Sequence, residues 1–304
     1  MRFPKKLKYG DTIGIIAPSS PVSLEKLNQC QKVLEDMGYK VKIGKSAYES
    51  VCGYMAGSAQ LRAEDINSMF ADKNIDAIFC IRGGYSSCTV MEYLNYDIIK
   101  NNPKIFVGYS DITSYNIAFN QKCDFVTYHG PMVSSNMISQ YDDFTKKSFE
   151  DALNMDEELE LKNPVGEEFK VLVEGYAKGR ITGGNMTLIN PSIGTDYEID
   201  TKGKILFLEE VEESVPKIEK MLYQLKYSGK FDDCAGVLIG DFSDCNNTYD
   251  ESYNVDCLMK DFFKDFKKPV MSNIKSGHCS PMSTIILGAV CTIDTEKKTI
   301  KFTR

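Results

Sequence analysis

A serine shortly after an apolar run is the first residue whose position suggests chemistry. Ser110 follows Ile105–Val107, and a helix-like segment, Asp111–Asn120, begins immediately after it. A serine at a strand-to-helix corner can act as a nucleophile if a base accepts its proton. The N–H groups at the start of the helix could then bind a developing oxyanion. Ile112 replaces the second glycine of the usual Gly-x-Ser-x-Gly corner, so the motif alone is weak. A helix cap at Ser110 or Asp111 is the simpler explanation.

Two histidines are the only candidates for the base. His278 lies in the Gly- and Ser-containing loop Lys275–Pro281, which suits a base that must approach a nucleophile. An exposed loop histidine is the alternative interpretation. His129 competes for the role, although a structural histidine that forms hydrogen bonds at a strand end explains it better. Cys279 is a poor nucleophile beside His278, because the side chains of adjacent residues rarely meet.

A carboxylate after an apolar run could orient such a base. Glu209 directly follows Ile205–Leu208, and a carboxylate at a buried strand end needs a partner, for which an imidazole is one candidate. Three neighbouring acidic residues have a simpler explanation, because negative charge is favoured at a helix N-terminus. We therefore expect Glu210, Glu212 and Glu213 at the start of the next helix.

Glycine pairs mark further strand ends. Gly83-Gly84 follows the apolar segment Ile75–Ile81 and would let a backbone N–H approach an oxyanion, but a tight turn explains it equally well. Gly183-Gly184-Asn185 leaves the same two interpretations open. Tyrosines near strand ends could contact a substrate. They are Tyr85, Tyr109 and Tyr128.

The composition is that of a globular protein and argues against several functional classes. The 304 residues are 42% hydrophobic, which is enough for a substantial core, and the net charge of −7 argues against nucleic-acid binding. Ten cysteines without short paired spacings indicate reduced thiols. No cluster suggests a metal site, and no apolar segment is long enough to span a membrane. We therefore expect a cytoplasmic protein without a metal.

Strands and helices alternate up to about residue 135. This alternation predicts a doubly wound α/β unit with a parallel sheet, whose site lies at the C-terminal ends of the strands. We expect strands at Thr12–Ala17, Tyr39–Ile43, Ile75–Ile81, Lys104–Tyr109 and Phe125–Tyr128, and helices at Ser23–Met37, Ser58–Ala71, Ser87–Leu94 and Asp111–Asn120. The strand ends carry Pro18-Ser19-Ser20, Gly83-Gly84, Ser110 and His129.

The second half has a different residue pattern, because glycines separate short β-like runs from Val171 onward. We expect a mixed, β-rich domain there. Its predicted strands are Lys204–Leu208, Ala235–Ile239, Ile285–Val290 and Thr299–Thr303, and its helices are Val215–Tyr227 and Val255–Phe266. The predicted organisation is a first domain over residues 1–140, a linker segment over residues 141–170 that begins with a helix, and a second domain over residues 171–304.

Several short segments occur in a fixed order along the chain. They are Ala17-Pro18-Ser19-Ser20-Pro21, Ala56-Gly57-Ser58, Arg82-Gly83-Gly84-Tyr85, Gly108-Tyr109-Ser110-Asp111-Ile112-Thr113, His129-Gly130-Pro131, Gly183-Gly184-Asn185, Leu208-Glu209-Glu210 and Gly277-His278. From about Leu7 to Phe302, this set resembles the LD-carboxypeptidase family of serine peptidases (family S66), which includes the microcin C7 self-immunity peptidases. Two positions depart from the family pattern: Ser86 replaces a frequent glycine, and Glu210 replaces a frequent aspartate.

The resemblance implies a catalytic triad and an oxyanion hole. The nucleophile would be Ser110, the base His278 and the orienting carboxylate Glu209. The backbone N–H groups of Gly84 and Asp111 would bind the oxyanion. Candidate substrate contacts are Tyr85, Tyr109 and Ser19.

The resemblance also implies a flavodoxin-like N-terminal domain, a swivelling β/β/α C-terminal domain with the site between them, a homodimer and no cofactor. The implied substrate is a small cytoplasmic muropeptide that loses its terminal D-amino acid during peptidoglycan recycling. Two alternatives remain. One is an immunity-type peptidase that cleaves aminoacyl or peptidyl nucleotides of the microcin C7 kind, and the other is a non-catalytic small-molecule binding module.

Overall fold

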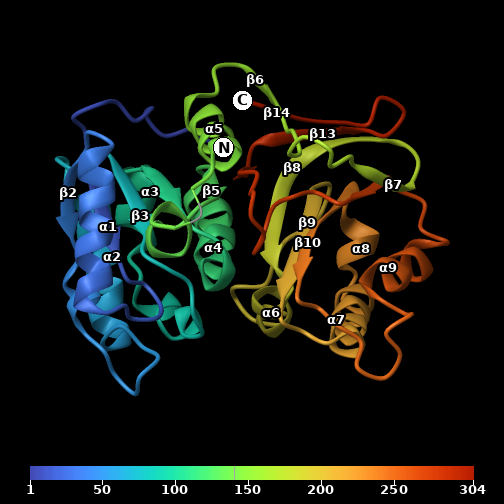
Figure 1. Ribbon diagram of the computed structural model, residues 1–304, viewed down its shortest axis with the longest axis horizontal. Coiled ribbons are helices and arrows are strands. Elements are labelled where there is room, and N and C mark those ends of the chain that lie inside the picture. Colours follow the sequence, from blue (N-terminus) through green and yellow to red (C-terminus); the bar gives the residue numbers. More distant parts are fainter. Residues whose placement is uncertain (140) are drawn as a thin grey trace. The chain divides into compact units, whose positions relative to one another are not determined.

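The chain forms two units. A computed structural model describes residues 1–139 and 141–304, and the units comprise Met1–Asn154 and Met155–Arg304 (Figure 1). Residues 141–170, which we expected to be a linker, contain helix α5 (Asp143–Asn154) of the first unit and strand β6 (Glu158–Glu160) of the second.

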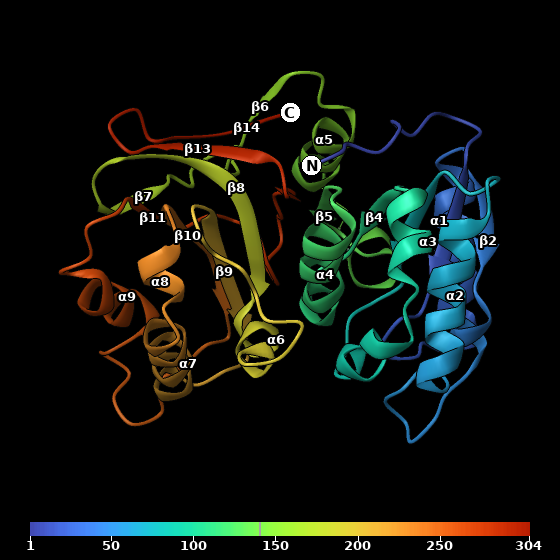
Figure 2. The same cartoon turned by 180° about the vertical axis from the view of Figure 1, so that it is seen from behind.

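The first unit contains the predicted parallel sheet. Its strands lie in the order β5-β4-β3-β1-β2, and every pair is parallel. They are β1 (Thr12–Ile16), β2 (Lys40–Ile43), β3 (Ala77–Cys80), β4 (Ile105–Val107) and β5 (Thr127–His129). Helix α1 lies on one face, and α2, α3 and α4 lie on the other (Figures 1 and 2). Because helices cover both faces, every residue of β3 and β4 is buried.

The first unit also contains helices, two of which begin at a serine cap. They are α1 (Leu24–Asp36), α2 (Ala59–Ala71), α3 (Tyr96–Asn101), α4 (Thr113–Cys123) and α5. The Ser23 and Ser58 hydroxyls accept hydrogen bonds from the first turns of α1 and α2, which satisfies N–H groups that have no partner within the helix. The helix predicted over Ser87–Leu94 is wrong. That segment forms two short 3₁₀ turns, Ser87–Thr89 and Met91–Tyr93.

Three further short helical segments lie in the first unit. They are the 3₁₀ turns Lys45–Tyr48 and Ser110–Ile112 and a π-helical turn, Val133–Met137. The second of these turns begins at the candidate nucleophile, so the helix expected from Asp111 starts as a tighter 3₁₀ turn before α4.

The second unit is built on a mixed sheet, as the sequence predicts. The strand order is β6-β14-β13-β8-β9-β10-β11-β7, with parallel pairing from β8 to β11 and antiparallel pairing toward both edges. Its strands are β6, β7 (Lys170–Val173), β8 (Tyr176–Asn185), β9 (Ile205–Val211), β10 (Gly236–Ser243), β11 (Val270–Ser272), β13 (Val290–Asp294) and β14 (Thr299–Thr303). A short strand, β12 (Ile285–Leu287), precedes β13.

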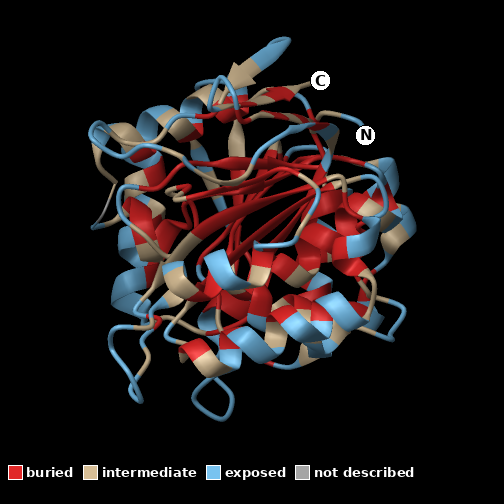
Figure 3. Cartoon of the chain, turned by 90° about the vertical axis from the view of Figure 1, so that its right-hand side faces the viewer, coloured by how far each residue is buried: buried red, intermediate tan, exposed pale blue. Residues whose placement is uncertain are grey.

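Helices of the second unit connect these strands. They are α6 (Met186–Ile189), a 3₁₀ turn (Asn190–Ser192), α7 (Val215–Tyr227), α8 (Lys230–Asp233) and α9 (Val255–Phe263). Buried residues follow the strands, whereas exposed residues lie on the outer helix faces and in loops (Figure 3). Helix α7 shows the amphipathic pattern, because its buried residues recur at helical spacing.

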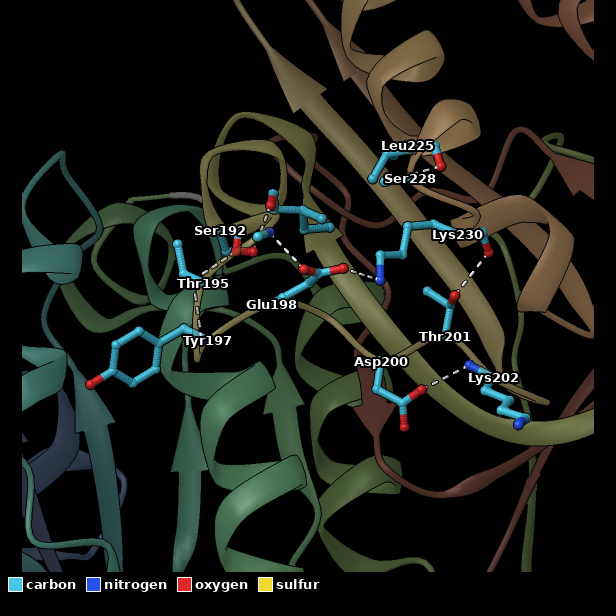
Figure 4. Close-up of polar contacts among 12 residues, drawn as sticks. Ser192, Thr195, Tyr197, Glu198, Asp200, Thr201, Lys202, Leu225, Ser228 and Lys230 are labelled. Carbon is cyan, nitrogen blue, oxygen red and sulfur yellow. Dashed lines mark hydrogen bonds and ion pairs between the residues drawn. The ribbon is translucent and has the colours of Figure 1, made fainter.

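Polar contacts hold the segment between α6 and β9 against α8 of the second unit (Figure 4). The Glu198 carboxylate forms an ion pair with Lys230 of α8 and accepts a hydrogen bond from the Gly194 N–H at 2.6 Å. The Thr201 hydroxyl donates to the Lys230 carbonyl at 2.9 Å. These contacts order the approach to β9, which carries Glu209.

Several chemical features of the described chain bear on function. All ten cysteines are free thiols. The described residues contain no group of three or more His, Cys, Asp or Glu side chains placed to hold a metal ion. Over the same part of the chain, none of the helices is both long enough and apolar enough to cross a lipid bilayer.

Candidate active site

Ser110 occupies a strained backbone corner in the first unit. It follows β4, opens the 3₁₀ turn before α4 and has a φ of 63°. This left-handed conformation is uncommon for a residue other than glycine. The Asn116 side chain donates to the Gly108 carbonyl at 3.0 Å and ties α4 back to the corner. The corner therefore has the sharp strand-to-helix geometry that presents a nucleophilic hydroxyl.

The Gly83-Gly84 segment passes close to this corner. A Cβ atom on Gly83 would lie 2.8 Å from the Ser110 Cβ and 3.3 Å from the Asp111 nitrogen, so only glycine fits. Gly84 has a φ of 150°, and a Cβ there would lie 2.5 Å from the Ser19 hydroxyl oxygen. The structure thus brings the segment of one expected oxyanion donor, Gly84, beside the other, Asp111.

The Asp111 side chain has a role that the sequence analysis missed. Its carboxylate is fully buried and accepts hydrogen bonds from the N–H groups of Ser86 and Ser87 at 2.9 and 2.8 Å. The hydroxyl groups of Ser87, at 2.7 Å, and Ser19 donate to it as well. Four donors therefore satisfy this buried charge.

Glu209 and His278 form a hydrogen-bonded pair in the second unit. Glu209 Oε2 lies 2.8 Å from His278 Nδ1, although the residues are 69 positions apart. Glu209 is fully buried in β9, and the His278 side chain is 17% exposed. An ionised carboxylate can only accept, so Nδ1 is the donor, and the neutral ring then carries its basic lone pair on Nε2. This is the arrangement expected of an oriented general base.

Carboxylates around His278 raise its pKa above the ordinary value. Burial lowers the pKa of His278, but the hydrogen bond that His278 donates to Glu209 and the charge of Glu209 raise it, and Glu210 and Asp241 add to this effect. The net direction is upward. The site therefore stabilises the imidazolium that forms when a general base accepts a proton.

Models of the LD-carboxypeptidase N-terminal and C-terminal domains match residues 13–130 and 178–293. These ranges include the Ser110 corner and the Glu209–His278 pair, respectively. A "Probable murein peptide carboxypeptidase" of Bacillus subtilis (strain 168) is 38% identical to the chain, over 97% of the chain and 92% of the relative. The chain belongs to the LD-carboxypeptidase family. It is accordingly a serine peptidase, a hydrolase of the carboxypeptidase type.

This LD-carboxypeptidase family member is also similar to a protein named for microcin C7 self-immunity and to solved structures of that kind. The "Microcin C7 self-immunity protein MccF" of Escherichia coli is 26% identical over 98% of the chain and 94% of the relative. MccF in complex with aspartyl sulfamoyl adenosine has a TM-score of 0.88 at 25% identity, over 99% of this chain and 98% of that chain. An MccF-like protein from Bacillus anthracis str. Ames has a TM-score of 0.88 at 30% identity, and the match covers 100% of both chains. The predicted fold class is thereby confirmed.

The expectation for Glu210 in this LD-carboxypeptidase was wrong. Glu210 does not lie at a helix N-terminus but is buried in β9, where the Asn185 side chain and the Thr187 N–H donate to it at 2.9 and 2.8 Å. Pairing with β8 continues to Glu209 and pairing with β10 to Val211, so the strand runs past the expected end. Helix α7 begins only at Val215. Burial raises the pKa of Glu210, and the charge of Glu209 adds to the effect.

The loop that carries His278 is held closely against Glu209. Gly277 has a φ of 132°, and a Cβ there would lie 2.8 Å from Glu209 Oε2. The base of the loop is anchored by Asn163, which donates to the Asn273 carbonyl at 2.6 Å and accepts from the Lys275 N–H at 3.0 Å. The imidazole is therefore positioned by its loop as well as by its carboxylate.

The remaining candidates lie in very different environments. The Tyr85 side chain is 80% exposed, whereas Tyr109 and Ser19 are buried. The Ser19 hydroxyl is used to bind Asp111. His129 is fully buried in the first unit, with its ring 5.7 Å from that of Tyr109. The substrate contacts assigned to Tyr85, Tyr109 and Ser19 stay predictions.

Proposed function

We propose that this LD-carboxypeptidase hydrolyses the amide between an L-configured centre and a terminal D-amino acid in muropeptides. We further propose that it acts in the cytoplasm, as a homodimer, in peptidoglycan recycling. The observation that carries the catalytic part is the 2.8 Å hydrogen bond between Glu209 Oε2 and His278 Nδ1. The loop of His278 comes so close to Glu209 that position 277 has no room for a Cβ atom. The 38% identity to a probable murein peptide carboxypeptidase supports the choice of substrate.

The proposed mechanism is acyl transfer through Ser110. His278 Nε2 accepts the hydroxyl proton as Ser110 Oγ attacks the scissile carbonyl carbon, and Glu209 stabilises the resulting imidazolium. The N–H groups of Gly84 and Asp111 bind the tetrahedral oxyanion, where one such donor is worth about 3–4 kcal/mol. The intermediate collapses as His278 protonates the departing amine of the D-amino acid.

Hydrolysis of the acyl-enzyme reverses these roles. His278 accepts a proton from water as the water oxygen attacks the ester carbon. The second tetrahedral intermediate then expels Ser110 Oγ, which takes the proton back from His278. The shortened peptide leaves as a carboxylic acid, and no metal or organic cofactor takes part in the proposed chemistry.

An immunity-type activity is the second candidate. It is supported by the 26% identity to MccF, which has been solved with aspartyl sulfamoyl adenosine. The chain contains no tryptophan, so an aromatic contact to a nucleobase would have to come from tyrosine or phenylalanine. This lowers the weight of the alternative.

The decisive experiment presents two substrates to the purified protein. One is a disaccharide-tetrapeptide that ends in D-Ala, with the L-Ala epimer as its control, and the other is an aminoacyl sulfamoyl adenosine. We expect release of D-Ala from the first substrate alone, and loss of that release in Ser110→Ala with retention of the fold. Cleavage of only the nucleoside would favour the immunity-type activity, and an active Ser110→Ala protein would refute the nucleophile.

A further inference from the structure

We propose that a buried network of Arg62, Ser86 and Asp111 positions both N–H donors of the oxyanion hole. These three side chains are positioning residues, because they act through the backbone of Gly84 and Asp111. The inference rests on the proposed function, since it assumes that these two N–H groups bind the oxyanion. The network would act on the two N–H groups in the same way for any peptide substrate.

Arg62 is the cationic end of the network. It lies on α2, is only 1% exposed, and forms no ion pair with a carboxylate among the described residues. Its guanidinium instead donates to the Ser86 carbonyl at 3.0 Å, the Ser86 hydroxyl at 2.8 Å and the Thr89 hydroxyl at 3.1 Å, and reaches the Pro18 carbonyl at 3.3 Å. A buried cation is tolerated only when such donors are satisfied. Arg62 therefore fixes the segment after Gly84.

Asp111 is the anionic end. The peptide group between Ser86 and Ser87 lies between the two charges, because its carbonyl accepts from Arg62 at 3.0 Å and its N–H donates to Asp111 at 2.8 Å. The peptide dipole is thus oriented with its negative end on the cation and its positive end on the anion. Each charge stabilises the orientation that the other requires, so the segment has one strongly favoured position.

This arrangement links the two expected donors. Asp111 supplies one of them through its own N–H, and its carboxylate holds the Ser86 and Ser87 N–H groups, just beyond Gly84. A change in the carboxylate therefore moves both donors relative to Ser110. Ser86 adds a hydroxyl acceptor for Arg62 where the family loop often has glycine.

The chain offers a matched control for the simpler explanation that these residues only stabilise the fold. Asp65 is a buried carboxylate on α2 that accepts from two consecutive backbone N–H groups, those of Lys45 and Ser46, at 3.0 and 2.7 Å. The turn it holds carries none of the proposed catalytic groups. Asp65→Asn therefore reproduces the loss of a buried carboxylate without touching the oxyanion hole.

The experiment measures kcat and KM for Arg62→Lys, Ser86→Ala, Asp111→Asn and Asp65→Asn in the full chain, below their melting temperatures. We expect Arg62→Lys and Asp111→Asn to lower kcat about 10- to 100-fold with little change in KM, since a shift near 1 Å can cost about 100-fold. Ser86→Ala removes one hydroxyl and should cost about 3- to 10-fold. Asp65→Asn should keep its kcat. If the variants of Arg62 and Asp111 match Asp65→Asn in kcat, the proposal is refuted.

A second readout separates this proposal from the proposed function. A fluorophosphonate reacts with an activated serine as the oxygen attacks phosphorus and fluoride leaves, and the phosphoryl oxygen occupies the oxyanion hole. We expect Arg62→Lys and Asp111→Asn to slow the labelling of Ser110 about 10-fold, whether or not the tetrapeptide is turned over. If Arg62→Lys and Asp111→Asn are labelled at the wild-type rate, the network is refuted. If the wild-type protein is labelled rapidly but releases no D-Ala, and the variants are labelled slowly, only the substrate assignment is refuted.

Discussion

Gly277→Ala should damage catalysis through Glu209, without removing any group of the proposed triad. An alanine Cβ would lie 2.8 Å from Glu209 Oε2, the oxygen that binds His278 Nδ1. To restore ordinary contact the carboxylate must move by about 0.6 Å, which lengthens a 2.8 Å hydrogen bond beyond the usual range. The charge of Glu209 remains, but the imidazole loses its fixed orientation.

The size of the effect follows from this displacement. Because misplacement by 1 Å can cost about 100-fold, we expect kcat to fall about 10- to 100-fold, or about 1.4–2.7 kcal/mol of transition-state stabilisation. Complete loss of an orienting carboxylate, which costs about 10⁴-fold in other triads, sets the upper limit. KM should change little, because no substrate contact is altered.

The pH dependence gives an independent measure of the same change. Glu209 holds the pKa of His278 above its ordinary value, so a weaker hydrogen bond lowers that pKa. A general base works in its neutral form. If His278 is the base, as proposed, the acid limb of the kcat/KM profile should therefore move to lower pH. Because the chain has two histidines, NMR titration of the ring protons can follow His278 directly.

Gly175→Ala is the matched control. Gly175 has a φ of 148°, close to the 132° of Gly277, but a Cβ there would meet nothing nearer than 3.4 Å. Both variants should lose about 1–3 kcal/mol of stability from backbone strain. Only Gly277→Ala should lose activity. If the two variants share the same kcat and acid limb, the role assigned to the Gly277 approach is wrong.

Three further predictions concern single ionisable groups. Glu209→Gln should lower kcat about 1,000-fold or more and move the acid limb of kcat/KM to lower pH, which a pH–rate profile measures. His129→Gln should keep clear activity, whereas His278→Gln should not. Equal losses of turnover in the two variants would make His129 a candidate for the general base again. Burial lowers the pKa of Lys104 to about 8 from its ordinary 10.5. Between pH 8 and pH 10.5 this lysine is therefore more protonated in the unfolded chain than in the folded chain. Denaturant unfolding should therefore show wild type gaining stability relative to Lys104→Met as the pH rises from 8 to 10.5.

The fold was predictable where the deciding interactions are local. The strands of the parallel sheet are apolar because helices cover both faces, and Ser23 and Ser58 mark the helix starts because an N-cap depends on the first turn alone. The segment Ser87–Leu94 was predicted as one helix but forms two short 3₁₀ turns. Arg62 and Asp111, both distant in sequence, hold it through the hydroxyl groups of Thr89 and Ser87. Local propensity contains no information about such a partner.

The site was predictable only in part, for the same reason. The residue types of Ser110, Glu209 and His278 suggested chemistry. Their spacing alone left purely structural explanations open, and only the family resemblance favoured catalytic roles. The contact between Glu209 and His278 spans 69 positions, so spacing could not reveal it. Arg62 gave no sequence signal, because an arginine in a helix is ordinarily exposed, and here non-local acceptors make its burial possible.

The left-handed backbone of Ser110 has an evolutionary consequence. A residue with a Cβ in this region costs about 1–2 kcal/mol relative to an ordinary conformation, and glycine is largely exempt from that cost. Ser110→Gly should therefore melt at a higher temperature than wild type while it turns over no substrate. Selection for thermal stability alone would favour glycine here, so the backbone strain at Ser110 is the stability cost of keeping the proposed nucleophile.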